Sequence, residues 1–306
     1  MWDYSGFMDK ARLYFSRAAE HPRAEDGAVA LFLLLGLEFL LRMPLAQVHP
    51  ALLAENGNGK NDSIMDAAGY PTGGSPKSVS TSVVISRLNL VVPGFKERAA
   101  DAEFLVKLRN AELHSSESAL AIDQEKWLPR FIRVVDVLCS HLGTTAEVLV
   151  GAELVAHGRR LVDAQDARLR HEITQRIDAA HAFFNTLDEA TLAARRVLRH
   201  RYFLQPVGRV DCPACGSPDR LLLEEVRATN ERLVKDEVHR DVVHIAKEFS
   251  CRICELRLTG TEEIHAAGLR QQYVIPQTQD ITDRFDGIDT GYYGDEVEHY
   301  FADADA

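Results

Sequence analysis

The sequence predicts a mainly α-helical chain of 306 residues that ends in a small β-rich module. Three observations lead to this fold class. Apolar residues recur at helical spacing through the first two hundred positions. Strand-forming residues become frequent after residue 206. Four of the five cysteines lie in this second part as two Cys-x2-Cys pairs. The length fits two domains, or one large domain and one small domain.

The helical part divides into segments at capping residues and at glycine or proline. We expect helices over residues 5–20, 25–42, 78–91, 96–114, 123–143, 145–185 and 189–203. Asp123 and Asp188 stand where N-caps are favoured, and Thr144 with Glu147 has the spacing of a capping box. Residues 55–77 are rich in glycine and proline, which predicts a long loop.

The segment predicted as a helix over residues 25–42 is apolar on every face, which indicates burial in a bundle centre or at a subunit interface. Glu38 interrupts it, and an unpaired carboxylate in apolar surroundings is costly. We therefore expect Glu38 to pair with Arg109 or Arg42. The alternative is a partly exposed glutamate at the edge of the helix.

No membrane span is expected. The apolar run from Val29 to Leu41 is short for a span and contains Glu38. The N-terminus lacks a basic region followed by an apolar core, so no secretory signal is visible. The sequence therefore predicts a cytoplasmic protein. In such a reducing compartment, paired cysteines favour metal over disulfides.

The formal net charge of −11 is unevenly distributed. Residues 280–306 contain nine carboxylates and one arginine, a charge of −8, which leaves −3 for the rest of the chain. This balance argues against broad, non-specific coating of DNA, but it does not exclude a nucleic-acid substrate. The acidic segment is expected to be solvated or to bind a partner.

The four paired cysteines predict one structural zinc ion. Two thiolates from one tight turn and two from a second complete a tetrahedron and leave no open position for hydrolysis. The arrangement resembles a zinc ribbon, with short strands expected over residues 221–226, 238–249 and 256–259. The alternative is two unrelated pairs or a redox pair. The predicted zinc ligands are Cys212, Cys215, Cys251 and Cys254.

The candidate catalytic motif is Arg-Asn-x3-His, formed by Arg109, Asn110 and His114. A histidine can take or give a proton at neutral pH, and an arginine can stabilise negative charge on a phosphate. On an unbroken helix Arg109 and His114 lie about 140° apart, whereas Asn110 and His114 share a face. Either Arg109 reaches around the helix, or the helix ends near His114. The alternative is a chance pattern on a surface helix.

Residues 1–143 resemble the HEPN domain, a helical family that contains many metal-independent ribonucleases. The resemblance depends on Gly36-Leu-Glu38-Phe-Leu-Leu-Arg42, followed by the Arg109–His114 motif. It implies an endoribonuclease that needs no catalytic metal, attacks through the 2′-hydroxyl and leaves 2′,3′-cyclic phosphate ends. It also implies a homodimer, with the 25–42 helix as a candidate interface and Glu38 as a supporting residue. Such proteins often act as toxins or in phage defence.

A basic segment precedes the cysteine module. It contains four candidate RNA-binding residues, although a solvated helix face is an alternative interpretation. These residues are Arg195, Arg196, Arg199 and Arg201.

The organisation expected from these features has four parts: a HEPN-like domain over residues 1–143, a helical connector over 144–204, the zinc ribbon over 205–272 and an acidic tail over 273–306. Two other functions remain open. The chain could be a non-catalytic module that binds nucleic acid or protein, or a zinc-ribbon regulator that binds DNA. The acidic tail or a regulatory protein partner is expected to restrain an active ribonuclease.

Overall fold

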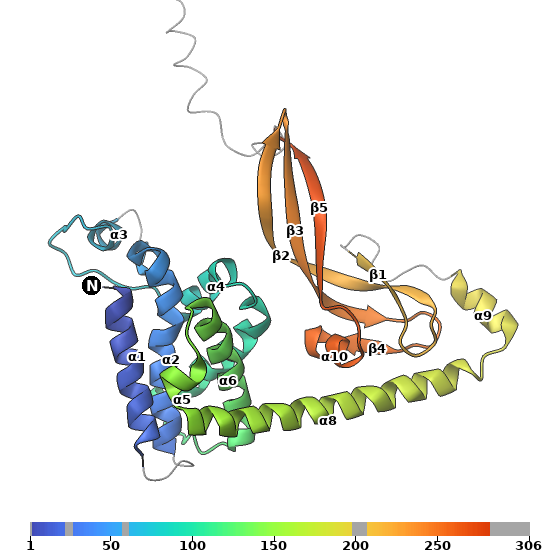
Figure 1. Cartoon of the computed structure of the whole chain (residues 1–306), viewed down its shortest axis with the longest axis horizontal. Helices are drawn as coiled ribbons and strands as arrows, with labels where there is room; N and C mark the ends of the chain where they lie inside the picture. Colours follow the sequence, from blue (N-terminus) through green and yellow to red (C-terminus); the bar gives the residue numbers. More distant parts are fainter. Residues whose placement is uncertain (1, 22–26, 57–60, 198–206, 282–306) are drawn as a thin grey trace, which may run out of the picture.

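The computed structural model describes residues 2–21, 27–56, 61–197 and 207–281. A helical bundle forms one body and a five-stranded sheet forms the other, with one long helix running along both (Figure 1). The mainly helical class and the C-terminal sheet are as predicted. The two buried cores are separate: one fills the bundle, and the other lies between the sheet and the long helix.

The bundle is built around α2. Gly36 of α2 faces the Phe15 ring of α1 so closely that an added Cβ would lie 2.4 Å from a ring carbon. A side chain at position 36 would force the two helices apart. The bundle contains α1 (Tyr4–Ala19), α2 (Gly27–Val48), α4 (Thr81–Val91), α5 (Ala99–His114), α6 (Gln124–His141) and the short α7 (Ala146–Val150).

Three local predictions for the bundle need correction. Helix α2 continues six residues beyond 42 and includes Pro44. The segment predicted as a long loop contains a short helix, α3 (Asp62–Ala67), and Asp66 accepts hydrogen bonds from the amide and hydroxyl of Thr72. The helix predicted over 145–185 is broken at Gly151, whose φ of 115° is a conformation that glycine favours.

Two predicted caps differ from the structure. Thr145, not Thr144, caps α7 by accepting a hydrogen bond from the amide of Val148. Asp123 occupies the N-cap position of α6, but its side chain makes no capping bond there. Asp188 caps α9 (Glu189–Arg196) as expected, accepting from the amide of Thr191.

Helix α2 is the one described helix that is long and apolar enough to cross a membrane by length and composition. It is longer than the run read from the sequence because it continues beyond residue 42. However, 61% of its most apolar window is buried inside the protein, and it contacts α1, α4, α5 and α6. This is the packing of the core helix of a bundle.

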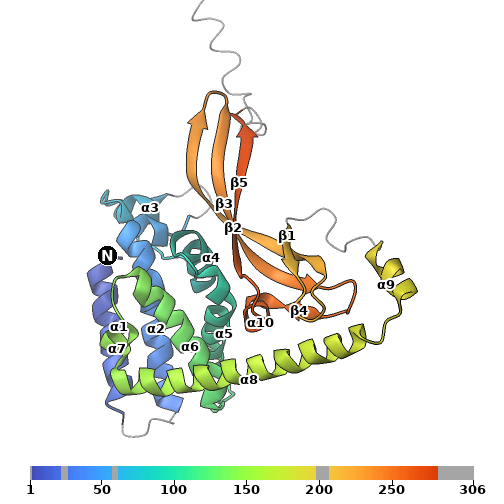
Figure 2. The ribbon, with the colours of Figure 1, turned by 45° about the vertical axis from the view of Figure 1, so that its right-hand side comes forward.

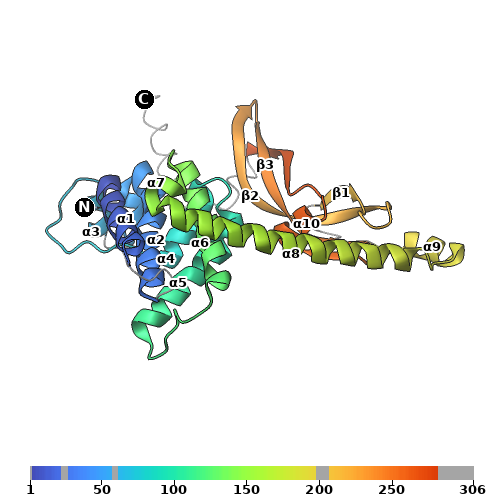
Figure 3. The same cartoon turned by 60° about the horizontal axis from the view of Figure 1, so that its bottom comes forward.

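Helix α8 (Ala152–Phe184) joins the two bodies, as Figures 2 and 3 show. At about 1.5 Å per residue, its 33 residues extend roughly 50 Å. Near its start, Gly158 packs on Ile132 of α6, where an added Cβ would lie 2.4 Å from a side-chain carbon. Towards its end, Ile173 and Ala180 are buried against the cysteine module.

The sheet is antiparallel, with the order β1-β2-β3-β4 and with β5 paired to β3. Two strands are longer than predicted, and β2 and β3 continue with β5 into a three-stranded arm that projects from the body (Figure 1). Residues 273–280 were assigned to the acidic tail from sequence, but they belong to β5. The boundary predicted between the ribbon and the tail therefore moves to the end of β5. The elements are β1 (Val207–Asp211), β2 (Pro218–Val234), β3 (Glu237–Ser250), β4 (Arg257–Thr259), α10 (Gly260–Ala266) and β5 (Gln272–Asp280).

Ion pairs connect the sheet to the helices. Lys96 contacts Glu224 of β2 at 2.8 Å, and Arg98 contacts Glu262 of α10 at 2.7 Å. On α8, Arg176 pairs with Glu263 at 3.0 Å. The ribbon therefore contacts both the bundle and the long helix.

Candidate functional site

The four paired cysteines meet at one point, as the sequence predicts. Their Sγ atoms all lie within 4.8 Å of one another, with Cys212 and Cys254 at 3.5 Å and Cys215 and Cys251 at 3.6 Å. A tetrahedral ion with metal–sulfur bonds of about 2.3 Å places its ligands roughly 3.8 Å apart. The cluster therefore fits one metal ion such as zinc, with all four positions taken by protein.

The two Cys-x2-Cys turns have the same backbone form. In the first, the amide of Gly216 donates to the carbonyl of Cys212 at 2.9 Å; in the second, the amide of Glu255 donates to Cys251 at 3.1 Å. Gly216 has a φ of 68° and Glu255 a φ of 62°. A left-handed conformation is strained for glutamate but not for glycine. The second turn therefore keeps the form of the first at an energetic cost.

A buried carboxylate fastens the second turn to the sheet. The side chain of Asp219, on β2, accepts hydrogen bonds from the amides of Arg252 and Arg220, each at 2.8 Å. It also lies 3.3 Å from the Nε of Arg252. Because the Asp219 side chain is fully buried, these bonds are shielded from water.

The long helix and the helix after it hold both turns from outside. His181 of α8 donates its Nδ1 hydrogen to the carbonyl of Ala214 in the first turn, at 2.7 Å. Arg195 of α9 donates to the carbonyl of Ile253 in the second turn, at 2.8 Å, and pairs with Glu255 at 2.9 Å. The metal centre is therefore connected to residues well before the cysteine module in sequence.

These contacts change the interpretation of the basic segment. Arg195 was predicted to bind RNA, but its guanidinium holds the second cysteine turn and stacks over the ring of Phe183 at 5.2 Å. Arg196 is largely exposed, 3.7 Å from Glu189, and its RNA contact stays a prediction. Arg199 and Arg201 lie outside the described residues.

The cysteine thiols are coupled to one another. Hydrogen bonds from Cys251 and Cys254 lower the pKa of Cys212 to about 4, because they stabilise its thiolate. The same bonds to Cys212 raise the pKa of Cys251 and of Cys254. The fifth cysteine, Cys139, behaves as a core residue: it is buried in the bundle, and burial raises its pKa to about 12.

Arg109 of the Arg-Asn-x3-His motif belongs to an ion-pair network between α2 and α5. Its Nη1 contacts the Oε2 of Glu38 at 2.5 Å, and Arg42 bonds the other oxygen of the same carboxylate. The three side chains are only 11–14% exposed. Glu38 therefore pairs with both arginines considered from the sequence, and the network keeps one net positive charge.

Sequence reasoning did not find Thr81, the fourth member of this network. Its hydroxyl donates to the Oε1 of Glu38 at 2.6 Å and lies 3.4 Å from Arg42. Thr81 begins α4, 43 positions after Glu38. No local pattern connects the two residues, and only the packing of α4 beside α2 brings them together.

The other two motif residues face solvent at the end of α5. Asn110 is exposed, and its Oδ1 accepts from the Nε and Nη2 of Arg109 at 3.1 and 2.8 Å. His114 is exposed and makes no hydrogen bond or ion pair with any residue that the structure describes. One of the two expected solutions to the 140° separation occurs, because α5 ends at His114 before extended Ser115. Arg109 contacts Glu38 and Asn110, and none of the contacts between described residues joins it to His114.

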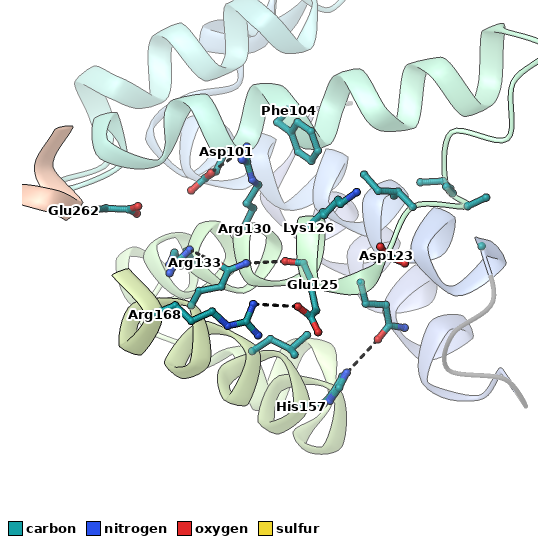
Figure 4. A pocket seen from close by; sticks show the side chains of 17 residues that line it. Asp101, Phe104, Asp123, Glu125, Lys126, Arg130, Arg133, His157, Arg168 and Glu262 are labelled. Atoms are coloured by element: carbon teal, nitrogen blue, oxygen red, sulfur yellow. Dashed lines mark hydrogen bonds and ion pairs between the residues drawn. The ribbon is translucent and has the colours of Figure 1, made fainter. Parts of the chain in front are cut away.

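A polar cleft of about 1260 Å³ lies elsewhere, between α5, α6, α8 and α10 (Figure 4). Its arginines are already paired. Arg133 contacts Asp166 at 2.5 Å and Arg168 contacts Glu125 at 3.4 Å. Arg130 lies over the ring of Phe104 at 4.4 Å. Cations and carboxylates balance along its walls, so the cleft does not select an anionic substrate.

Comparison of the chain with family models, curated proteins and solved structures found no match.

Proposed function

We propose that this chain is a metal-independent endoribonuclease of the HEPN type. One observation carries the proposal: His114 is exposed, has no polar partner among the residues that the structure describes, and shares the last turn of α5 with Asn110, beside an arginine that Glu38 holds in place. A free imidazole can exchange protons with substrate, and a guanidinium fixed by a carboxylate is already oriented.

In the proposed reaction the 2′-oxygen of RNA attacks the adjacent phosphorus, and the bond from phosphorus to the 5′-oxygen breaks. His114 takes the proton of the 2′-hydroxyl, and the departing 5′-oxygen takes a proton from water. Arg109 stabilises the negative charge that develops on the phosphate oxygens. The product ends are a 2′,3′-cyclic phosphate and a 5′-hydroxyl, so DNA is not a substrate.

We place a homodimer contact on the half-exposed face of α2. The residues of this face are apolar and lie beside Glu38, so a second copy docked there would bring two Arg109–His114 sets close together. The face consists of Leu31, Phe32 and Leu35, which are partly exposed. Phe39, next along the helix, is covered by Phe7, Lys10 and Tyr14 of α1.

Zinc is the ion that we assign to the four cysteines, as a structural centre in a reducing cytoplasm. A toxin or phage-defence role follows from the HEPN resemblance and is part of this proposal. The acidic segment or a protein partner would then hold activity in check.

A second function has its own observation. Every hydrogen bond of the Arg109 side chain that the structure describes goes to Glu38 or Asn110, inside the protein. Such contacts also suit a non-catalytic module in which Arg109 only joins α2 to α5.

The experiment that separates the two uses His114→Ala, because His114 is exposed and makes no hydrogen bond or ion pair within the described part of the chain. Purified protein is incubated with total cellular RNA and EDTA, and metal analysis confirms that the cysteine-bound ion remains. We expect cleavage with cyclic phosphate ends by the natural sequence, and a loss of roughly 100-fold or more in His114→Ala. His141→Ala, a partly exposed histidine at the end of α6, is the control.

Equal cleavage by both histidine variants would assign the activity to another site or to a contaminant. Absence of cleavage by the natural sequence would favour the non-catalytic module.

A further inference from the structure

Three arginines lie in one row across the ribbon's sheet. Arg209 of β1 stands directly opposite Arg220 of β2, and Arg257 of β4 stands opposite Ser250 of β3. Because Leu221 pairs with Phe249, Arg220 lies beside Ser250 one step further along the same register. The order across the sheet is therefore arginine, arginine, serine, arginine.

This row lies on the outer face of the sheet. Residues of a strand point alternately to its two faces. Leu221, Phe249 and Leu258 are fully buried, and they face the core between the sheet and α8. Their neighbours Arg220 and Arg257 therefore point the other way; Arg257 is exposed and Arg220 is partly exposed.

The three guanidinium groups have no partner in the part of the chain that the structure describes. Arg252, by contrast, is paired with Asp219. Like charges directly opposite on a sheet are destabilising, so Arg209 and Arg220 repel each other. Asp211 of β1 and Glu248 of β3 are carboxylates on the same face, and three arginines against two carboxylates leave this face with one net positive charge.

We propose that this row binds the phosphate backbone of single-stranded RNA. The inference rests on the proposed ribonuclease function and adds a binding surface outside Arg109 and His114. Strands are about 4.8 Å apart, so the row spans roughly 14 Å from β1 to β4. A row of this length can contact more than one phosphate of an extended strand. Guanidinium groups match phosphate oxygens, and the contact would be independent of base sequence.

The test measures binding without cleavage. The probe is a fluorescent single-stranded RNA with 2′-O-methyl groups throughout, which lacks the attacking hydroxyl. Its anisotropy is followed against full-length protein at several NaCl concentrations. The variant is Arg209→Gln/Arg220→Gln/Arg257→Gln. The control, Arg12→Gln/Arg160→Gln/Arg170→Gln, removes the same charge from exposed helical arginines.

We expect the row variant to bind RNA about 10-fold more weakly at 0.1 M salt, while the control binds as before. Each phosphate contact contributes about −0.7 to the slope of log K against log salt, so losing three contacts makes the slope shallower by about 2. The row variant should also melt about 1 °C higher, because a like-charge pair is removed.

Equal affinity of the row variant and the natural sequence would overturn the proposal, as would absence of binding by the natural sequence. A peptide of residues 282–306 could instead bind the row while RNA affinity is unchanged by the three arginine substitutions. The row would then be a docking site for the acidic segment and not an RNA-binding surface. Binding does not require catalysis. The binding experiment therefore still tests the arginine row if the cleavage experiment fails.

Discussion

The cysteine centre and the Arg109 network are both polar clusters in apolar surroundings, but they are held by different means. The cysteines sit in two turns that are fastened separately by Asp219, His181 and Arg195. The network depends on one carboxylate, Glu38, shared by two arginines. The cysteine centre is therefore held from several sides, whereas the network has one anchor, Glu38, and His114 lies outside it at the end of α5.

The largest expected effect lies at the cysteine centre. Cys251→Ala removes one of four ligands, and structural zinc sites in small modules contribute on the order of 10 kcal/mol. We expect the ribbon to lose metal and its cooperative unfolding transition while the bundle stays helical. Metal content and circular dichroism during heating measure this. Cys139→Ala is the control and should keep the metal. Retained metal in Cys251→Ala would contradict the four-ligand centre.

A smaller effect is expected in the network. Arg109→Ala leaves Glu38 mostly buried with Arg42 and Thr81 as remaining partners. Losing one partner of a largely buried ion pair should lower the free energy of unfolding by about 2–3 kcal/mol, discounted for slight exposure. Urea denaturation of the bundle measures the loss. Lys107→Ala, an exposed residue on the same helix, should change little. A stability equal to that of the natural sequence would show that Glu38 does not need Arg109.

The smallest effect concerns the second cysteine turn. Glu255→Gly removes the strain of a left-handed glutamate but also its ion pair with Arg195. The strain is about 1–2 kcal/mol, and the pair of a largely exposed carboxylate contributes less than about 1 kcal/mol. We expect the free energy of unfolding of the ribbon to rise by about 0.5 kcal/mol, measured by chemical denaturation. Glu255→Ala keeps the strain and loses the pair, so it should destabilise. A destabilised glycine variant would mean that the ion pair outweighs the strain.

The sequence predicted the parts of each site that have a local signature. Cysteine spacing identified all four ligands, and the cost of a buried carboxylate identified a partner for Glu38. The remaining contacts depend on tertiary packing. Thr81 meets Glu38 because α4 lies beside α2, and Arg195 meets the second turn because α8 carries α9 to it.

The strands were predicted less well than the helices. The range expected for β3, 238–249, is close to the observed strand, whereas β2 continues beyond residue 226 into a largely exposed, polar half that the pattern did not mark. Strand β5 was assigned to the tail because acidic composition dominated the expectation. Its burial alternates between half-buried and exposed residues, which is weak support for a strand until the pairing with β3 is known.

Helix α8 sets the angular phase between the two bodies. Each residue advances a helix by about 100°, so inserting one residue between Gly158 and Ile173 would rotate the ribbon's docking face by that angle relative to the bundle. Insertions of seven residues would return the face to within about 20°, yet would move the ribbon roughly 10 Å away from Lys96 and Arg98. The length of this helix is therefore fixed by two requirements, the direction of the docking face and its distance from the bundle. Insertions and deletions in α8 should be disfavoured even where substitutions on its surface are tolerated.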